Sequence, residues 1–147
     1  MKPPRLSSEV VHASTVSIDG RAVLITGPSG SGKSDLALRL LDRGFTLVSD
    51  DQTLVRREDD RLIASAPLNI AGKLEIRGLG IVEMAHVGDM PVALLVELTS
   101  DIARMPDDSR ERPILGVSVP LVSIDAMAAS APSKVAVALD RMGLKFP

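Results

Sequence analysis

Short apolar runs separated by polar turns fill the first third of the chain, and they predict strands around one helix. Apolar residues alternate weakly over 10–18, which indicates a first strand, and Asp19-Gly20 is a typical hairpin turn into a second strand over 21–26. Residues 35–43 instead repeat Leu and Ala at helical spacing and stop at Gly44, a residue type that commonly ends helices. The pattern predicts a hairpin followed by a helix.

The rest of the chain is predicted to be mostly strands. Segments with strand character lie at 45–49, 53–56, 61–64, 92–98 and 117–124, the last of them interrupted by Pro120. Segment 74–83 alternates charged and apolar residues around two glycines, and the polar segment 99–112 is expected to be a loop or a broken helix. Helical spacing returns over 131–142 and stops at Gly143.

The hairpins after the first strand–helix unit argue against a purely parallel sheet. We predict a single compact α/β domain with a mixed β-sheet. The length of 147 residues suits one domain with one core. Residues 1–8 are polar and contain proline, so we expect them to form a flexible tail before a domain over 9–147.

Composition excludes several classes of function. Apolar residues make up 45% of the chain and aromatic residues only 1%, so the core must be aliphatic and platforms for stacking nucleic-acid bases are lacking. A net charge of −2 with scattered basic residues also argues against nucleic-acid binding. Without cysteine there are no disulfides and no thiolate zinc sites. No apolar run is long enough to span a membrane and residues 1–8 lack the apolar core of a signal peptide, so we expect a cytoplasmic protein.

A glycine-rich segment between the second predicted strand and the first helix matches the pattern G-x-x-x-x-G-K-[ST] of a phosphate loop (P-loop). Its residues are Gly27, Pro28, Ser29, Gly30, Ser31, Gly32, Lys33 and Ser34. Glycines let the amides turn toward an anion, Lys33 brings a cation to the β- and γ-phosphates, and the Ser34 hydroxyl is a Mg²⁺ ligand. The alternative is a turn that only joins strand to helix. We predict binding of a nucleoside triphosphate, with Lys33 exposed on the loop.

Two carboxylates follow the strand predicted at 45–49. Strands that flank such a helix commonly pair in parallel, so the strand is expected to end beside the phosphate loop and to place Asp50 and Asp51 there. Successive residues of a strand point to opposite faces, which allows one Asp to serve Mg²⁺ and its neighbour to reach a substrate hydroxyl. A helix cap or turn pair is the alternative interpretation.

His12, the phosphate loop and the segments 43–51 and 74–83 together resemble the catalytic domain of HPr kinase/phosphorylase. Typical strings of that family are R-G-H-x-L-V-A-D-D and L-E-I-R-G-L-G-I-[IV], and the second stands almost verbatim at 74–82. The likeness covers about residues 9 to 120. It implies a fold similar to that of phosphoenolpyruvate carboxykinase rather than of ordinary P-loop enzymes.

The resemblance also implies an activity: an ATP- and Mg²⁺-dependent kinase that phosphorylates a serine of HPr, a small phosphocarrier of the sugar phosphotransferase system. It implies that Asp51 takes the serine proton and that Ser34 and Glu75 bind magnesium, which leaves Asp50 for the same metal. It places His12 in the active site too, although a histidine such as His12 is, taken alone, more often an ordinary strand residue. Family members resemble hexamers, so a homo-oligomer is expected.

An active-site arginine of the family corresponds to Arg104, which lies ten residues before the family-like Ile114-Leu115-Gly116. The Asp that precedes it in the family is Ala103 here. A late family motif, P-[VI]-[RK]-x-G-R, falls near 123–130, where this chain has no cation. The family motif is linked to dephosphorylation, in which a phosphate ion attacks the phosphoserine and two anions must come together. Since the cations are missing here, we expect kinase activity to exceed phosphorylase activity. With His12 so near the start, we also expect the family's N-terminal domain to be missing.

Other functions remain open on the residues alone. Segment 99–112, with three arginines, resembles a short lid of a small-molecule P-loop kinase. A non-catalytic nucleotide-sensing module is the second alternative, and Glu75 with Arg77 is also explained as a surface pair. A GTPase is disfavoured because the base-reading motif N-K-x-D is absent.

Overall fold

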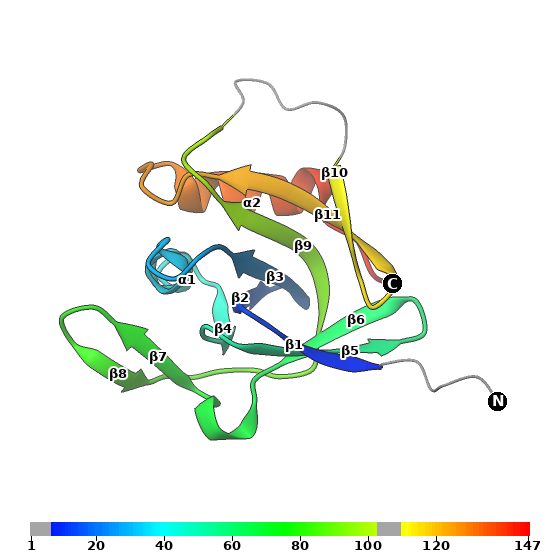
Figure 1. Cartoon of the computed structure of the whole chain (residues 1–147), viewed down its shortest axis with the longest axis horizontal. Coiled ribbons are helices and arrows are strands. Elements are labelled where there is room, and N and C mark those ends of the chain that lie inside the picture. The colour runs from blue at the N-terminus through cyan, green and yellow to red at the C-terminus, as the bar shows by residue number, and fades with distance from the viewer. Residues whose placement is uncertain (1–6, 103–109) are drawn as a thin grey trace.

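The computed structural model describes residues 7–102 and 110–147, and these form one nine-stranded sheet, a separate two-stranded hairpin and two α-helices. The strands are β1 (Ser8–Val11), β2 (Ala13–Ile18), β3 (Arg21–Thr26), β4 (Thr46–Ser49), β5 (Thr53–Glu58), β6 (Arg61–Ser65), β7 (Lys73–Ile76), β8 (Gly80–Glu83), β9 (Met90–Leu98), β10 (Arg110–Ile114) and β11 (Val117–Ile124). The helices are α1 (Lys33–Leu41) and α2 (Ala131–Met142), with a 3-10 turn at Leu68–Ile70. The predicted mixed α/β architecture is confirmed (Figure 1).

The long strand β9 organises the sheet, whose order is β1-β5-β6-β9-β3-β2-β4. One edge of β9 pairs with β3 in parallel, and the other pairs with β6 at its start and with β11 in parallel at its end. The strand β10 then pairs with β11 in antiparallel fashion. Three parallel strands, β3, β9 and β11, therefore end at one edge of the sheet.

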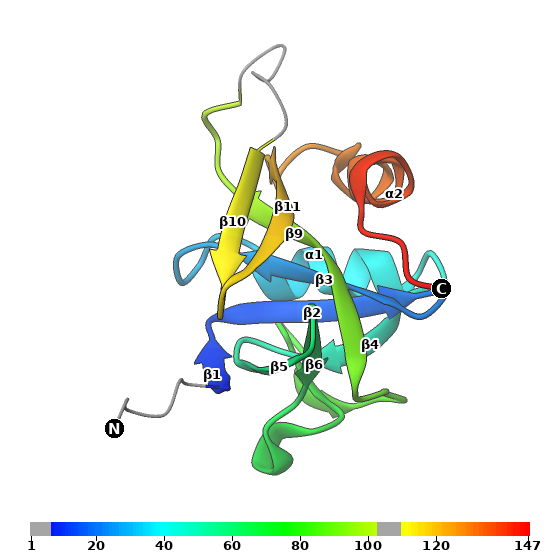
Figure 2. The ribbon, with the colours of Figure 1, turned by 90° about the vertical axis from the view of Figure 1, so that its right-hand side faces the viewer.

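Alternating residues of the central strands fill two apolar layers. Val23 and Ile25 pack on one face with Leu36 and Leu40 of α1, and α2 joins the same layer. Leu24 and its neighbours face the opposite layer, which holds residues of β5, β6, β9 and β11. Figure 2 shows α2 and β10 on opposite sides of β9 and β11. Both layers are almost wholly aliphatic, as the composition requires.

The predicted neighbours of the phosphate-loop strand differ from those observed. We expected the strand before the loop and the strand before Asp50 to lie side by side, but β2 lies between β3 and β4 and pairs with both in antiparallel fashion. The hairpin partner of β3 thus occupies the position expected for β4. Because β3 and β4 still run in the same direction, the loop and Asp50 lie at the same edge of the sheet.

Two strand boundaries also differ from prediction. The expected strand over 10–18 is broken at His12, where the chain bends so that β1 pairs with β5 while β2 pairs with β3. Pro120 does not interrupt β11, because β9 pairs with β11 only from Leu121 onward and leaves that edge of Pro120 without a ladder to break.

The strand β10 was not predicted, since part of the polar segment 99–112 was expected to be loop. Its residues Arg110, Glu111 and Arg112 are charged on both faces of the strand and give no apolar alternation. Residues 103–109 of that segment lie outside the described residues. None of the helices in the described part of the chain is both long and apolar enough to cross a membrane.

An ion pair far from the phosphate loop gives the fold a pH dependence. Asp89 Oδ1 accepts hydrogen bonds from Arg56 Nη1 at 2.8 Å and from Ser65 Oγ at 3.0 Å. The Arg56 guanidinium, helped by Ser65, holds the pKa of Asp89 below its usual range. A carboxylate with a lowered pKa stabilises the folded state above its unfolded pKa, and that contribution is lost as the pH falls through the folded pKa.

We therefore expect Asp89→Asn to be slightly less stable than the wild-type protein at about pH 7, with the difference shrinking as the pH falls to about 3. Urea unfolding of both proteins across this range measures the difference. Asn tolerates the positive φ of 53° at this position, so the substitution tests charge and not backbone strain. A difference that does not change with pH contradicts the assignment.

Candidate functional site

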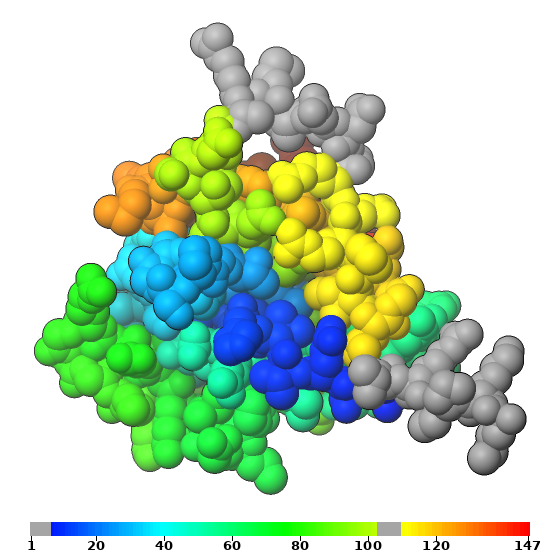
Figure 3. Space-filling view, in the orientation of Figure 1, coloured from blue at the N-terminus to red at the C-terminus, as the bar shows by residue number. Residues whose placement is uncertain are grey.

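The loop 27–34 between β3 and α1 has the close packing that its glycines allow. A Cβ on Gly27 would lie 2.6 Å from Ser31 Oγ, so no larger residue fits without a shift. Gly32 precedes α1 with φ 100°, a conformation that side chains disfavour. The helix N-terminus therefore opens directly onto the loop, an arrangement that suits an anion. In Figure 3 the loop, in light blue, reaches the surface.

Lys33 lies across this loop. Its ammonium donates to the backbone carbonyls of Gly27 at 2.9 Å and of Pro28 at 3.3 Å, and the residue is only 7% exposed. The expectation of an exposed lysine is wrong, because the side chain folds back over the loop and does not extend into solvent. A charged group held at the inner side of a phosphate loop is positioned to meet a phosphate oxygen.

One buried hydroxyl in the loop lacks a protein partner. Ser31 Oγ makes no hydrogen bond to any of the described residues, although its surface is buried. Buried polar groups are nearly always satisfied, so an orphan atom in a phosphate loop fits a missing polar ligand. The residues of the loop thus fit a nucleotide phosphate.

Asp50 is the centre of the hydrogen bonds beside the loop. Its Oδ1 accepts from Ser34 Oγ at 2.6 Å and from Ser14 Oγ at 2.8 Å. Its Oδ2 accepts from the backbone N–H of Glu75 at 3.1 Å, and the residue is 8% exposed. A hydroxyl paired with a buried carboxylate at a phosphate loop is a donor set that Mg²⁺ uses in P-loop enzymes.

Asp51 differs from its neighbour in exposure and in backbone conformation. It is exposed, and its backbone adopts φ 65°, which is uncommon outside glycine but tolerated by Asp. Its N–H donates to Ser14 Oγ at 3.1 Å. Ser14 thus links the two acids, and its hydroxyl holds Asp50 and Asp51 in fixed relative positions.

Of the three remaining candidate residues, one lies beside the loop, one bonds to Asp50 and one lies outside the described residues. His12 is exposed at the bend between β1 and β2, and the pairing of Ala13 with Thr26 puts it beside the start of the loop. Glu75 is exposed on β7 and touches Asp50 through its backbone N–H. Arg104 lies outside the described residues.

No set of three or more His, Cys, Asp or Glu side chains within residues 7–102 and 110–147 is arranged to hold a metal. A cage built only from protein carboxylates is therefore not present in that part of the chain. Mg²⁺ in kinases does not need one, because it takes one or two carboxylates together with phosphate oxygens and water.

Sequence reasoning missed Ser14, the residue that joins the two acids. It stands in a strand with small and apolar neighbours, and no motif marks it. Its role emerges only from the structure, in which Ser14 is 0% exposed and takes Asp50 as its hydrogen-bond partner.

Comparison with known proteins shows the family of this chain. A family model described as HPr Serine kinase C-terminal domain matches residues 5–143. The chain belongs to that family. The HPr kinase/phosphorylase of Chlorobium limicola is 39% identical over 150 aligned positions, which cover 92% of this chain and 44% of that protein. The one from Geobacillus thermodenitrificans is 49% identical over 98 positions, which cover 57% of this chain and 32% of that protein.

A solved structure extends the match to three dimensions. The HPr(Ser) kinase/phosphatase from Coxiella burnetii superposes with a TM-score of 0.78 at 33% identity, covering 90% of this chain and 94% of that chain. The predicted membership of the HPr kinase family and its catalytic fold are therefore confirmed. The chain spans less than half the length of the curated relatives it matches.

Proposed function

We propose that this HPr kinase C-terminal domain is an ATP- and Mg²⁺-dependent kinase that phosphorylates a serine of an HPr-type phosphocarrier. The observation that carries the proposal is the Ser34–Asp50 hydrogen bond of 2.6 Å beneath a phosphate loop, with exposed Asp51 as the next residue. Phosphoryl transfer requires positioning and charge neutralisation more than covalent chemistry, and this site supplies both.

The loop residues divide the work of holding the nucleotide. The backbone amides of 27–34 and the N-terminus of α1 bind the phosphates. Lys33 exchanges its hydrogen bonds to the carbonyls of Gly27 and Pro28 for hydrogen bonds to phosphate oxygens. Ser34 and Asp50, with Glu75 nearby, would hold a Mg²⁺ ion, which would supply positive charge to neutralise the transferred phosphate.

Asp51 is the general base. Its carboxylate accepts the proton of the substrate serine as the serine oxygen forms a bond to the γ-phosphorus and the bond to the β-phosphate bridging oxygen breaks, which yields ADP and a phosphoserine. Such a base contributes about 10²–10⁴-fold in rate. His12, beside the start of the loop, adds hydrogen bonds around the transferred group, and Arg104 adds positive charge.

We further propose a cytoplasmic protein that acts on a protein substrate and not on nucleic acid or a membrane. The composition that argues against nucleic-acid binding supports this, with 1% aromatic residues and a net charge of −2. Assembly into a homo-oligomer, as the family resemblance implies, belongs to the same proposal.

Incubation with γ-labelled ATP, Mg²⁺ and a purified HPr-type phosphocarrier tests the function, followed by mapping of the labelled residue. We expect label on one serine, and none on a carrier in which that serine is replaced by alanine. ATP binding without transfer to the carrier supports a nucleotide-sensing module instead. Transfer to a small metabolite in place of the carrier supports a small-molecule kinase.

A further inference from the structure

The strand β2 extends past the end of its neighbour β4, at the turn that carries the two acids. The ladder between these strands ends at Thr15 opposite Ser49, whereas β2 continues to pair with β3 as far as Ala13 opposite Thr26. The register also shifts within the ladder to β4, an irregularity of a kind that often lies next to active sites. Ser14 is therefore a strand residue that faces the turn and not another strand on that side.

The hydroxyl of Ser14 replaces backbone pairing at this point. Its O–H donates to Asp50 Oδ1 at 2.8 Å, and its oxygen accepts from the backbone N–H of Asp51 at 3.1 Å. A serine hydroxyl has one donor and two acceptor lone pairs, so both bonds form at once. Ser14 is 0% exposed, which shields these bonds from competing water.

The two acids depend on Ser14 to different degrees. Asp50 is buried and keeps two other partners, the Ser34 hydroxyl and the Glu75 N–H. The N–H of Asp51 has Ser14 as its one partner among the described residues, and the Asp51 carboxylate accepts no hydrogen bond from them. The φ of 65° at Asp51 is uncommon outside glycine, and such conformations persist where the surroundings hold them in place.

The other hydrogen bonds of this turn fasten its ends and not its centre. The Gln52 N–H donates to the Asp50 carbonyl at 2.7 Å, and Thr53 Oγ1 donates to a backbone carbonyl of β2 at 2.9 Å. Thr15 Oγ1 lies 2.7 Å from Thr53 Oγ1 in a further buried pair. None of these bonds reaches Asp51.

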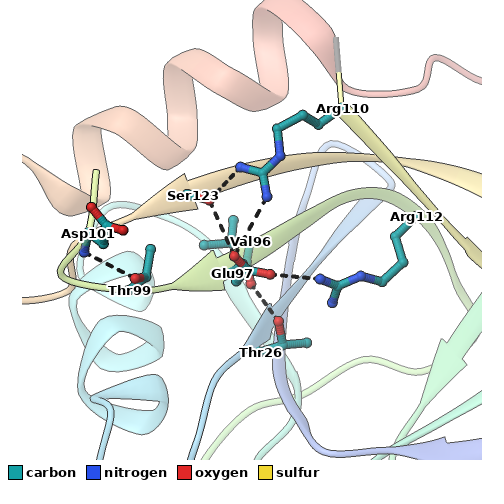
Figure 4. Close-up of polar contacts among 8 residues, drawn as sticks. All are labelled: Thr26, Val96, Glu97, Thr99, Asp101, Arg110, Arg112 and Ser123. Carbon is teal, nitrogen blue, oxygen red and sulfur yellow. Dashed lines mark hydrogen bonds and ion pairs between the residues drawn. The ribbon is translucent and has the colours of Figure 1, made fainter. Parts of the chain in front are cut away.

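Polar side chains at the ends of β9 and β11 do not supply a second link to the acids. Arg110 donates to Ser123 Oγ at 2.6 Å, and Arg112 donates to Glu97 Oε2 at 2.7 Å (Figure 4). These groups bond to one another. Within the part of the chain that the structure describes, Ser14 is thus the one side chain that bonds to both acids.

We propose that Ser14 is a positioning residue for phosphoryl transfer, which acts through Asp51 and not through the nucleotide. Its hydroxyl ties the Asp51 amide to the buried Asp50 carboxylate, so the carboxylate of the base keeps one orientation beside the phosphate loop. A misplacement of about 1 Å at a reacting group can cost about 10²-fold in rate. This role rests on the proposed kinase function with Asp51 as the base.

The variant Ser14→Ala of the full chain tests the role. In the carrier-labelling assay we expect kcat to fall by at least about tenfold while the KM for ATP changes by less than about threefold. Thr15→Val is the matched control, because it removes a neighbouring buried hydroxyl that bonds to Thr53 and to neither acid. It should keep kcat within about twofold of the wild-type value.

A double-mutant cycle shows whether Ser14 acts through Asp51. In the Asp51→Asn background, Ser14→Ala should lower kcat by less than about threefold, because the base that Ser14 positions is already lost. A purely structural role predicts the same loss in both backgrounds, and a comparable loss in Thr15→Val. Either of these results overturns the proposal.

Hydrogen exchange of the Asp51 amide tests the link without the reaction. We expect this amide to exchange at least about tenfold faster in Ser14→Ala than in the wild-type chain, and Thr15→Val to keep the wild-type rate. Equal exchange rates in all three proteins overturn the proposal. If the wild-type chain labels no carrier, the kinase assignment itself fails. If Ser14→Ala labels the carrier as fast as the wild-type chain does, the kinase assignment stands and the role of Ser14 fails.

Discussion

Asp51→Asn is expected to slow transfer of phosphate to the carrier serine by about 10²-fold or more while nucleotide affinity stays nearly unchanged. The amide has the size of the carboxylate but cannot accept the serine proton. Asn also tolerates the positive φ of 65° at this position, and the backbone N–H that bonds Ser14 is retained. Initial rates with labelled ATP and a separate ATP titration measure the two quantities.

Asp59→Asn provides a matched control. Asp59 also has a positive φ, 54°, and is exposed at the hairpin tip between β5 and β6, away from the phosphate loop. The same change of charge and shape there should leave the rate within about twofold of the wild-type value. Unchanged turnover in Asp51→Asn dismisses Asp51 as the base, whereas loss of ATP binding in that variant assigns it to the nucleotide.

Local signals in the sequence were sufficient for the elements whose boundaries depend on neighbouring residues. Asp19-Gly20 produced the expected hairpin, and α2 covers 131–142 as predicted, with its last turn closed by backbone bonds from Gly143. Turn and cap residues fix backbone conformation within a few positions, so they act in the same way in any fold.

Pairings between distant segments were not available from local patterns. The position of β2 between β3 and β4 depends on how three strands share one apolar layer, which no single segment encodes. The strand β10 shows a second limit: it is held to β11 by a two-residue turn in which Leu115 has φ 49°. Leucine rarely adopts this conformation, so the sequence Leu115-Gly116 does not predict a hairpin turn.

The candidate site divides in the same way. The motif at 27–34 and the acids at 50–51 predict the proposed chemistry, because binding of phosphate and Mg²⁺ calls for those residue types. The position of Ser14 between the two acids, and the reach of Arg110 to Ser123, come from strand register alone. Their partners lie 36, 37 and 13 positions away along the chain.

Lys33→Met is expected to weaken binding of ATP with Mg²⁺ by at least about tenfold, because charge-assisted hydrogen bonds to phosphate are lost. Methionine is chosen because Lys33 is buried, and its apolar stem needs a replacement of similar length. Lys33→Ala should lose the same affinity and also some stability, since it leaves space under the loop. Calorimetric ATP titration and thermal unfolding measure the two effects independently.

Lys134→Met is the control for this substitution, because it makes the same chemical change outside the loop. Lys134 is exposed in the first turn of α2. It should keep wild-type ATP affinity and nearly the wild-type melting temperature. Among the described residues the Lys33 ammonium bonds only to loop carbonyls, so in Lys33→Met we expect the fold to lose little and the proposed phosphate site to lose a cation. If Lys33→Met instead binds ATP as tightly as Lys134→Met does, the loop 27–34 is a structural turn and the nucleotide site must be sought elsewhere.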